Sequence, residues 1–503
     1  MTSDLKSSVA SPPSRATTTR ELGAVIAALS LLISLVAWWL VRQGYILYYG
    51  DALAHLNISR SVIDSHTPGY EQLGSVWLPA LHLLCLPLVR NDWLWSTGLA
   101  GTIPVALCFV IAGSVFYVSA RHFYGSALAA FVVLGCLVLN PNILYLSAIP
   151  MTETVFLAGL SVLLFSAVRF TATRQVRFMI VGIAALWFMC LTRYDGWFLI
   201  PFAALWFAWQ ARNKRLITFL SISSASALVP VYWFAHNWWE TGNPLDFANG
   251  PYSAWAIQGG KPYPGFHDWP KAVLYYATAG QLCAGWGLVL LGIAGLVCAL
   301  HARRAEPVIF LLLTPAFYVL SIQSSGLPVR VPQLPPHDYY NSRYGIAVVV
   351  FCAFAVGAIV RVIPRQVKRT AYLLPLLAVT PWIASPARES WICWKESEVN
   401  SLSRRIWTES AAGFFRAHYG EGQGIIAPFG DLTGIFCRAG IHIREVLHEG
   451  NGPLWFATTT RPDLIHNQAW AVSQGRDYGP EYRTVQEIEV KAEPALRILK
   501  RIH

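Results

Sequence analysis

Charged residues are scarce in this chain. Only 13% of its 503 residues are Asp, Glu, Lys or Arg, whereas an average soluble domain holds roughly 25%. Hydrophobic residues make up 55%, and long apolar runs follow one another. This composition excludes an ordinary soluble protein and predicts a polytopic membrane protein. The net charge of +11 does not indicate nucleic-acid binding, because Lys and Arg concentrate in short loops between apolar runs, as in cytoplasmic loops.

Paired cysteines at metal-ligand spacing are also missing. The chain has nine cysteines, and seven of them lie in or beside apolar runs, where they are expected to be small core residues. Cys393 and Cys437 lie in the polar C-terminal part, where a disulfide between them is open if that part is extracytoplasmic. Residues 1–20 lack any sustained apolar pattern. We expect them to form a disordered cytoplasmic tail before an uncleaved first span.

About eleven apolar runs are long enough to predict membrane-spanning helices. The predicted fold is therefore mainly α, a helical bundle over residues 21–384. The runs cover residues 22–41, 98–119, 126–146, 152–168, 178–191, 197–209, 216–234, 273–300, 307–322, 344–360 and 371–384.

One more apolar segment, Val76 to Val89, is short and contains Pro79 and Pro87. Counting it as a span would move most Lys and Arg clusters to the outer side, against the positive-inside rule. We therefore expect a helix on the membrane surface. On this topology the outer side holds residues 42–97, the turns near 152 and 194, the loops 235–272 and 323–343, and everything after 385. We place the protein in the plasma (inner) membrane, with its active site extracytoplasmic.

The C-terminal part, residues 385–503, has shorter apolar runs and more charge. Trp391 to Tyr419 shows helical spacing of apolar residues. Short strands are predicted at 424–428, 441–443, 455–457 and 485–490, between Gly, Asn and Pro. We expect a small α/β domain.

Asp51 follows the first apolar run, and His55 follows it by four positions, so a helix would place both on one face. The surrounding residues alternate as in an amphipathic helix lying at the interface. Asp51 is either a helix N-terminal acid with a solvated His55 or a reacting carboxylate next to a substrate-binding imidazole. Spacing alone leaves both interpretations open.

Glu153 opens a predicted span on the same side as Asp51. It is either a carboxylate favoured by the helix dipole or a second functional acid. Two carboxylates that converge at a membrane surface can share acid and base work or hold a divalent metal. A metal site formed by Asp51 and Glu153 therefore stays open.

Two arginines lie at outer ends of spans. Arg193 in Arg193-Tyr194-Asp195 is either part of a surface ion pair or a contact for an anionic headgroup. Arg343 follows Tyr340 and precedes a span, where it either snorkels beside belt tyrosines or binds phosphate. We take both arginines as candidate donor-phosphate ligands and Tyr340 as a substrate contact.

The outer loop around Asn237 to Tyr263 is rich in aromatic and amide side chains. Sugar rings stack on aromatic faces and their hydroxyls need hydrogen-bond partners, although aromatics beside a membrane are often belt residues. The length of this loop favours a functional role. Tyr252 and Lys261 are its substrate-binding candidates.

Taken together, these motifs resemble those of the GT-C superfamily, membrane glycosyltransferases that use polyprenyl-phosphate sugars. The resemblance rests on Asp51, Trp77-Leu78-Pro79, Glu153, the Arg193 to Trp197 turn, Asn243-Pro244-Leu245 and Asn341 to Tyr344. It is strongest to the branch of protein O-mannosyltransferases and aminoarabinose transferases and covers residues 20–384. It implies that Asp51 is catalytic base or metal-site residue, Glu153 the second acid, and Arg343 and Arg193 phosphate ligands. Many relatives carry a second acid where this chain has Ala52.

The resemblance implies transfer of a sugar from a polyprenyl-phosphate carrier to a glycan, lipid or protein acceptor, at the surface of the membrane lipid. Chemically, a base must deprotonate the acceptor and a cation must stabilise the departing phosphate. The alternatives are a transporter or flippase of a lipid-linked or anionic solute and a non-catalytic assembly protein. Transporters often show internal repeats and polar residues at mid-membrane. This sequence has no visible repeat, and its notable polar residues lie on one side.

Overall fold

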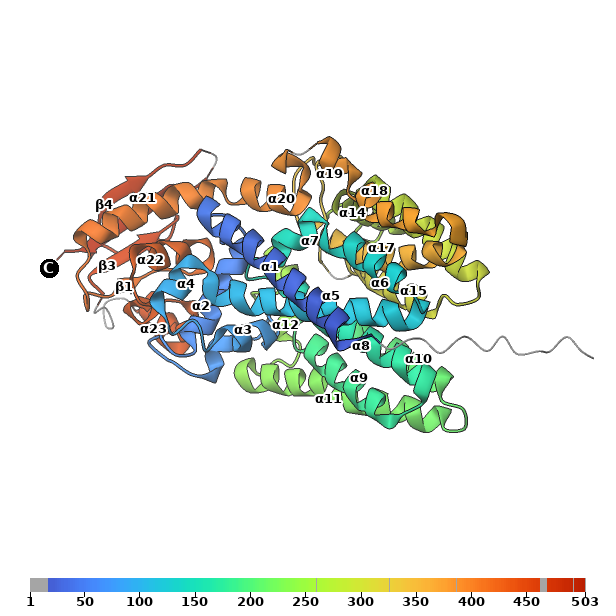
Figure 1. Ribbon diagram of the computed structural model, residues 1–503. Helices are drawn as coiled ribbons and strands as arrows, with labels where there is room; N and C mark the ends of the chain where they lie inside the picture. The colour runs from blue at the N-terminus through green and yellow to red at the C-terminus, as the bar shows by residue number, and fades with distance from the viewer. Residues whose placement is uncertain are drawn as a thin grey trace, which may run out of the picture.

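The computed structural model describes residues 17–502 except 259, 325, 386, 462–467 and 492. Figure 1 shows a bundle of helices with a smaller part, made of the C-terminal strands and helices, against one end. Residues 1–16 of the predicted tail lie outside the described residues. Thr18 is the N-cap of the first helix, which begins at Thr19.

Each predicted span coincides with a helix or with two or three consecutive short helices. Among the described residues, seven helices are long and apolar enough to cross a membrane, so this is a multi-pass membrane protein; α6 and α9 are shorter apolar helices. The count of eleven crossings stays a prediction. The bundle helices are α1 (Thr19–Gln43), α5 (Leu99–Tyr124), α6 (Ala127–Val138), α7 (Pro141–Leu146), α8 (Thr152–Thr173), α9 (Val176–Cys190), α10 (Asp195–Gln210), α11 (Arg215–Thr241), α14 (Trp269–His301), α15 (Glu306–Leu311), α16 (Leu313–Ser324), α17 (Ile346–Val362), α18 (Leu374–Ala378) and α19 (Thr380–Ala384).

The first outer loop forms α2 (Gly50–Ser61), the 3-10 turn η1 (Tyr70–Leu73), α3 (Ala80–Cys85) and α4 (Asp92–Thr97). At 1.5 Å per residue, the six residues of α3 reach about 9 Å, far less than a bilayer core of about 30 Å. The segment Val76 to Val89 therefore does not cross. Both the apolar and the polar side of α2 are buried, including Asn57 and Arg60. The amphipathic pattern predicts that the polar face of α2 is exposed to water. In the structure, other parts of the protein cover that face.

Three of the basic loops, those of Arg121, Arg169 and Arg304, meet at the end of the bundle away from Asp51. Arg121 pairs with Glu21, Arg169 contacts His122 and Arg304 lies over Phe123. The charge pattern therefore grouped these loops correctly, and their cytoplasmic position remains a prediction.

Gly285 breaks α14 in its middle. Its φ of 74° and ψ of 149° are not helical, and glycine adopts such a conformation at no steric cost. Near the break, the carbonyl of Cys283 accepts hydrogen bonds from the amides of Asn140 and Asn142. The side chain of Cys283 in turn contacts the Ser342 carbonyl. The kink thus supports the turn that carries Arg343.

Short elements connect the long helices on the side of Asp51: α12 (Asp246–Asn249), α13 (Ala254–Gln258) and η2 (Ser342–Gly345). On the opposite side η3 (Arg365–Leu373) leads into α18. After α19 the chain is back on the side of Asp51, where η4 (Arg388–Ser390) carries Arg388 next to Tyr45.

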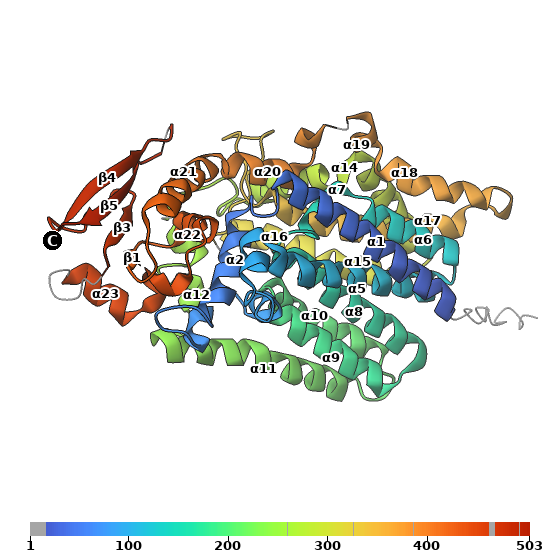
Figure 2. The same ribbon diagram turned by 60° about the vertical axis from the view of Figure 1, so that its left-hand side comes forward.

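The C-terminal part contains helices and one five-stranded sheet, as predicted. Strand order is β2-β1-β3-β5-β4; β1 is parallel to β2 and β3, and β5 is antiparallel to β3 and β4. Figure 2 shows this sheet at the end farthest from the bundle. Its elements are α20 (Ile392–Asn400), α21 (Leu402–His418), β1 (Ile425–Ile426), η5 (Gly430–Leu432), α22 (Thr433–Ala439), η6 (Ile443–Glu445), β2 (Val446–Leu447), η7 (Glu449–Asn451), α23 (Pro453–Thr460), β3 (Trp470–Ser473), β4 (Tyr482–Ile488) and β5 (Leu496–Arg501).

The helix predicted from Trp391 to Tyr419 is present as α20 and α21, and the strands near 425 and 485 are present. Two other strand predictions are wrong. Residues 455–457 lie in α23, where Pro453 occupies the first turn, and residues 441–443 precede the strand β2. Short apolar runs do not distinguish strand from helix, which explains the error at 455.

The predicted domain boundary at residue 384 stays a prediction. However, Ile392, Cys393 and Trp394 of α20 pack in the hydrophobic core of the bundle. Cys393 lies 3.9 Å from Cys283, sulfur to sulfur, and both Cys393 and Cys437 are free thiols. The disulfide left open between Cys393 and Cys437 is therefore not formed.

Candidate active site

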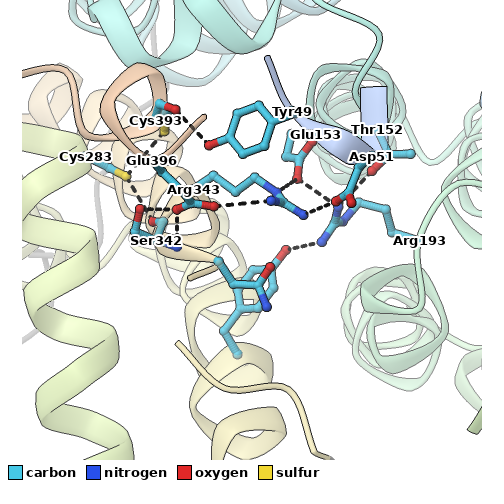
Figure 3. A network of polar contacts seen from close by, with 12 residues as sticks. Tyr49, Asp51, Thr152, Glu153, Arg193, Cys283, Ser342, Arg343, Cys393 and Glu396 are labelled. Carbon is cyan, nitrogen blue, oxygen red and sulfur yellow. Dashed lines mark hydrogen bonds and ion pairs between the residues drawn. The ribbon is translucent and has the colours of Figure 1, made fainter. Parts of the chain in front are cut away.

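Arg343 lies at the centre of a polar cluster at the end of the bundle (Figure 3). Its Nη2 is 2.5 Å from Asp51 Oδ2, its Nε 3.1 Å from Glu153 Oε1 and its Nη1 3.3 Å from Glu396 Oε1. Three segments that are far apart in the sequence thus meet on one guanidinium. A planar guanidinium with five N–H donors suits such multiple carboxylate contacts.

The chain turns sharply before Arg343. Asn341 has a left-handed φ of 54°, which Asn tolerates better than most residues. A Cβ on Gly345 would lie 2.3 Å from the carbonyl oxygen of Ala279, so only glycine lets the turn lie this close to α14. Asn341 and Gly345 thereby hold Arg343 at the end of α17.

Glu153 joins both arginines. Its Oε1 accepts from Arg343 and, at 3.2 Å, from Arg193 Nη1, and its side chain is 2% exposed. Arg193 also donates to Thr152 Oγ1 and Tyr318 OH and pairs with Asp195 at 3.4 Å. The Arg193–Asp195 pair is therefore buried rather than a surface ion pair.

Glu396 on α20 is the functional candidate that sequence reasoning missed. Its Oε2 accepts from the Ser342 amide at 2.7 Å and from the Ser342 hydroxyl, and its side chain is 2% exposed. Burial raises the pKa of Glu396, while Arg343 and the bonds from Ser342 oppose that rise. The apolar turn Ile392-Cys393-Trp394 just before it was the one signal that α20 packs into the bundle.

Asp51 is the member of the cluster that water reaches. Its side chain is 38% exposed, against 2% for Glu153 and Glu396. It lies in the first turn of α2. The next residue, Ala52, is 0% exposed, so a second acid at that position would have to be buried.

Aromatic rings surround the two guanidiniums. Arg343 lies 4.9 Å from the Tyr49 ring and 5.3 Å from the Tyr344 ring, and Arg193 lies 5.1 Å from the Tyr344 ring. The Tyr318 ring stacks on Tyr344 at 4.8 Å. Cation–π contacts of this kind hold the guanidiniums in place when they are shielded from water.

The geometry does not suit a metal held by Asp51 and Glu153. Both carboxylates face the guanidinium of Arg343, whose positive charge lies where the cation would be. The described residues contain no group of three or more His, Cys, Asp or Glu side chains able to hold a metal ion.

The remaining candidates are placed differently. His55 is buried, its Nδ1 lies 2.8 Å from His82 Nε2 and its ring lies 4.6 Å from that of Trp77. Burial, followed by the charges of Arg343 and Arg193, lowers the pKa of His55 to about 3. His55 is thus a neutral, enclosed imidazole rather than a solvated one. Its role as a substrate contact stays a prediction.

Tyr340 lies close enough to the cluster for the charges of Asp51 and Arg343 to affect its phenol. Burial raises the pKa of Tyr340, and Asp51 raises it further, whereas Arg343 lowers it. Tyr252 and Lys261 are exposed, and in the part of the chain that the structure describes neither contacts a residue of the cluster. Tyr252 instead lies near Glu449 and Arg476 of the C-terminal part. Their substrate-binding roles remain predictions.

A small pocket of about 30 Å³ lies beside Glu153, Arg193 and Asp195, and side chains of α8, α15, α16 and α17 form its other walls.

The chain has the GT-C fold that the sequence motifs predict, because two crystal structures of ArnT from Cupriavidus metallidurans are similar to it over nearly their full length. The first, bound to undecaprenyl phosphate, has a TM-score of 0.59 and 14% identity, covering 96% of this chain and 99% of that one. The second, in the apo state, has a TM-score of 0.58 and 14% identity, covering 95% and 98%. No protein-family model and no curated protein matches the sequence.

Proposed function

We propose that this protein is a membrane glycosyltransferase that moves a sugar from a polyprenyl-phosphate carrier to a hydroxyl acceptor. The observation that carries the proposal is the meeting of Asp51, Glu153 and Glu396 on Arg343 at one end of the bundle. The fold shared with ArnT, and the undecaprenyl phosphate bound in one ArnT structure, support the choice of carrier.

The charges of the cluster indicate how a phosphate would enter. Two guanidiniums, Arg193 and Arg343, face the carboxyl groups of Asp51, Glu153, Asp195 and Glu396. An added phosphate would increase this excess of acidic groups. We infer that the donor phosphate replaces Asp51 on Arg343, because Asp51 is the exposed partner and the other two carboxylates on Arg343 are buried.

This exchange frees the base for the chemical step. The acceptor oxygen attacks the anomeric carbon, the bond from that carbon to the phosphate oxygen breaks, and the hydroxyl proton passes to Asp51. The polyprenyl phosphate leaves with the bonding electron pair, next to the charge of Arg343. Glu153 and Glu396 hold the guanidinium in position.

An apolar groove offers a place for the isoprenoid chain near the cluster. It has a volume of about 340 Å³ and runs between α1, α7 and α19, with the indoles of Trp39, Trp382 and Trp391 among its walls. Tyr145 also lines it, and the Tyr145 ring lies 6.3 Å from that of Tyr49, which contacts Arg343. The groove thus ends two aromatic rings away from the guanidinium.

The test is a transfer assay with the full-length protein and a polyprenyl-phosphate sugar labelled in the sugar. An enzyme releases free carrier and a labelled product, whereas a transporter or flippase moves the lipid intact and an assembly protein leaves it unchanged. If several donor sugars and acceptor classes give no release above that of a variant with Asp51→Asn, the proposal is rejected.

A further inference from the structure

A second cleft separates the start of the first outer loop from the C-terminal part. It has a volume of about 680 Å³, within the usual range for ligand sites. One wall is apolar and comes from the end of α1 and the loop after it: Val41, Ile46 and Leu47. The other wall, from α21 and α22, carries arginines.

This cleft lies on the other side of α2 from the Arg343 cluster. Leu53 lines the cleft, and Asp51 binds Arg343. Two residues along a helix are separated by about 200° of rotation, so these side chains point in nearly opposite directions. A ligand in the cleft would not touch the carboxylates around Arg343.

The arginine wall carries a positive charge that carboxylates neutralise only in part. Arg404 pairs with Asp431 at 3.2 Å, and Arg438 pairs with Glu409 at 2.6 Å. The third arginine, Arg405, has no carboxylate within ion-pair distance among the residues that the structure describes.

Neutral partners hold Arg405 in a fixed orientation. Its Nε donates to Ser401 Oγ at 3.1 Å, its Nη1 donates to Tyr48 OH at 3.1 Å, and its guanidinium lies 4.2 Å over the Tyr48 ring. A partly buried guanidinium without a counter-charge is costly unless an anion binds it. The cleft is therefore built for a negatively charged group.

The position relative to the membrane indicates which anion. Trp38 on α1 is 59% exposed, and Arg42 lies 5.8 Å from its ring. Exposed Trp beside Arg near the end of an apolar helix marks the headgroup level of a bilayer. Val41 of the cleft is adjacent to Arg42, so the apolar wall begins where lipid chains meet headgroups.

We propose that this cleft binds an anionic phospholipid from the leaflet on the side of the C-terminal part. Its phosphate would lie on Arg405, with Arg404 and Arg438 nearby, and the upper part of a chain would cover Val41, Ile46 and Leu47. The lipid would bridge α1 and α21, and so hold the C-terminal part against the bundle. This site does not depend on the proposed transfer reaction.

Native mass spectrometry of the full-length protein in detergent tests the proposal, with phosphatidylglycerol and phosphatidylcholine as probes. We expect phosphatidylglycerol to bind more tightly than phosphatidylcholine, and Arg405→Gln to weaken its binding about tenfold, consistent with the loss of a charged hydrogen bond. Arg405→Lys should restore part of the loss. Arg483→Gln, which removes an exposed arginine on β4, is the matched control and should bind as the parent does.

Each of the following results would overturn the proposal: equal binding of the two lipids, unchanged phosphatidylglycerol binding in a folded Arg405→Gln protein, or equal weakening by Arg483→Gln. Displacement of the lipid by inorganic phosphate at comparable concentration would assign the site to soluble phosphate and overturn the lipid assignment. Thermal unfolding without added lipid verifies that the variants are folded. The assay measures no sugar transfer, so it can fail or succeed independently of the proposed function.

Discussion

Arg343 Nη2 lies 2.5 Å from Asp51 Oδ2, although 292 positions separate the two residues in the sequence. Asp51 is 38% exposed, whereas the other carboxylates on the same guanidinium are 2% exposed. This difference divides the three acids into two that fix Arg343 and one that can be exchanged.

Glu396→Ala should destabilise the protein and lower transfer. It leaves the buried Ser342 N–H without its acceptor, at a cost of about 1–3 kcal/mol. Glu396→Gln keeps an acceptor oxygen and should be milder. Thermal unfolding in detergent measures the stability, and the labelled-donor assay measures the transfer. Glu398→Ala, two positions along on the same helix and 32% exposed, should change the free energy of unfolding by no more than about 0.5 kcal/mol. Equal effects at both positions would contradict this role of Glu396.

Glu396 shows where sequence reasoning stopped. Lys395 and Glu398 flank it, and helical spacing alone cannot tell a buried glutamate from exposed ones. Loop charge predicted that Asp51, Glu153, Arg193 and Arg343 lie on one side, and ion pairs join all four. Their catalytic and phosphate-binding roles stay predictions. The loop candidates Tyr252 and Lys261 rested on composition. Composition does not specify how a long loop folds, and the structure leaves both exposed.

Arg343→Lys should reduce transfer strongly and also lower stability. A lysine ammonium cannot reproduce the planar set of contacts to Asp51, Glu153 and Glu396. Removing one partner of a buried charged pair typically costs about 3–5 kcal/mol, and the retained charge should make the loss smaller than in Arg343→Ala. If the phosphate replaces Asp51 on this side chain, the donor KM rises as well. Arg497→Lys, in an exposed pair with Glu487, is the control. Wild-type donor KM and kcat in Arg343→Lys would exclude the phosphate role.

Stability should fall in mild acid, partly because of His55. Its folded pKa is about 3, and the ordinary value is 6.5. Between these values the unfolded state holds more protons, so the free energy of unfolding decreases as pH falls from about 6.5 towards 3. His55→Gln should make this dependence shallower, although His82, whose pKa is also lowered by burial, keeps part of it. Midpoints of thermal unfolding between pH 7.5 and 5 measure the slope. His418→Gln, which removes an exposed imidazole, should leave the slope unchanged. An unchanged slope in His55→Gln would show that His55 does not contribute to the pH dependence.

Filling the apolar groove should impair use of the lipid donor. Leu144 lies in its wall, and Leu144→Trp would occupy space that the isoprenoid chain needs. We expect a raised KM for a long-chain donor and a smaller change for a donor with a truncated chain. Leu31→Trp, at an exposed position of α1, controls for the added indole. The same KM change for both chain lengths would exclude the groove as the binding site of the isoprenoid chain.

In the proposed reaction, Asp51 accepts the proton of the acceptor after the donor phosphate has replaced it on Arg343. The most direct measurement is sugar release from a labelled polyprenyl-phosphate donor by full-length Asp51→Asn, together with binding of that donor. We expect no release above background and retained or tighter donor binding, because a neutral amide competes less for Arg343. Glu71→Gln, another acid of the first outer loop, should transfer normally. Release at the parent rate by folded Asp51→Asn would exclude Asp51 as the base.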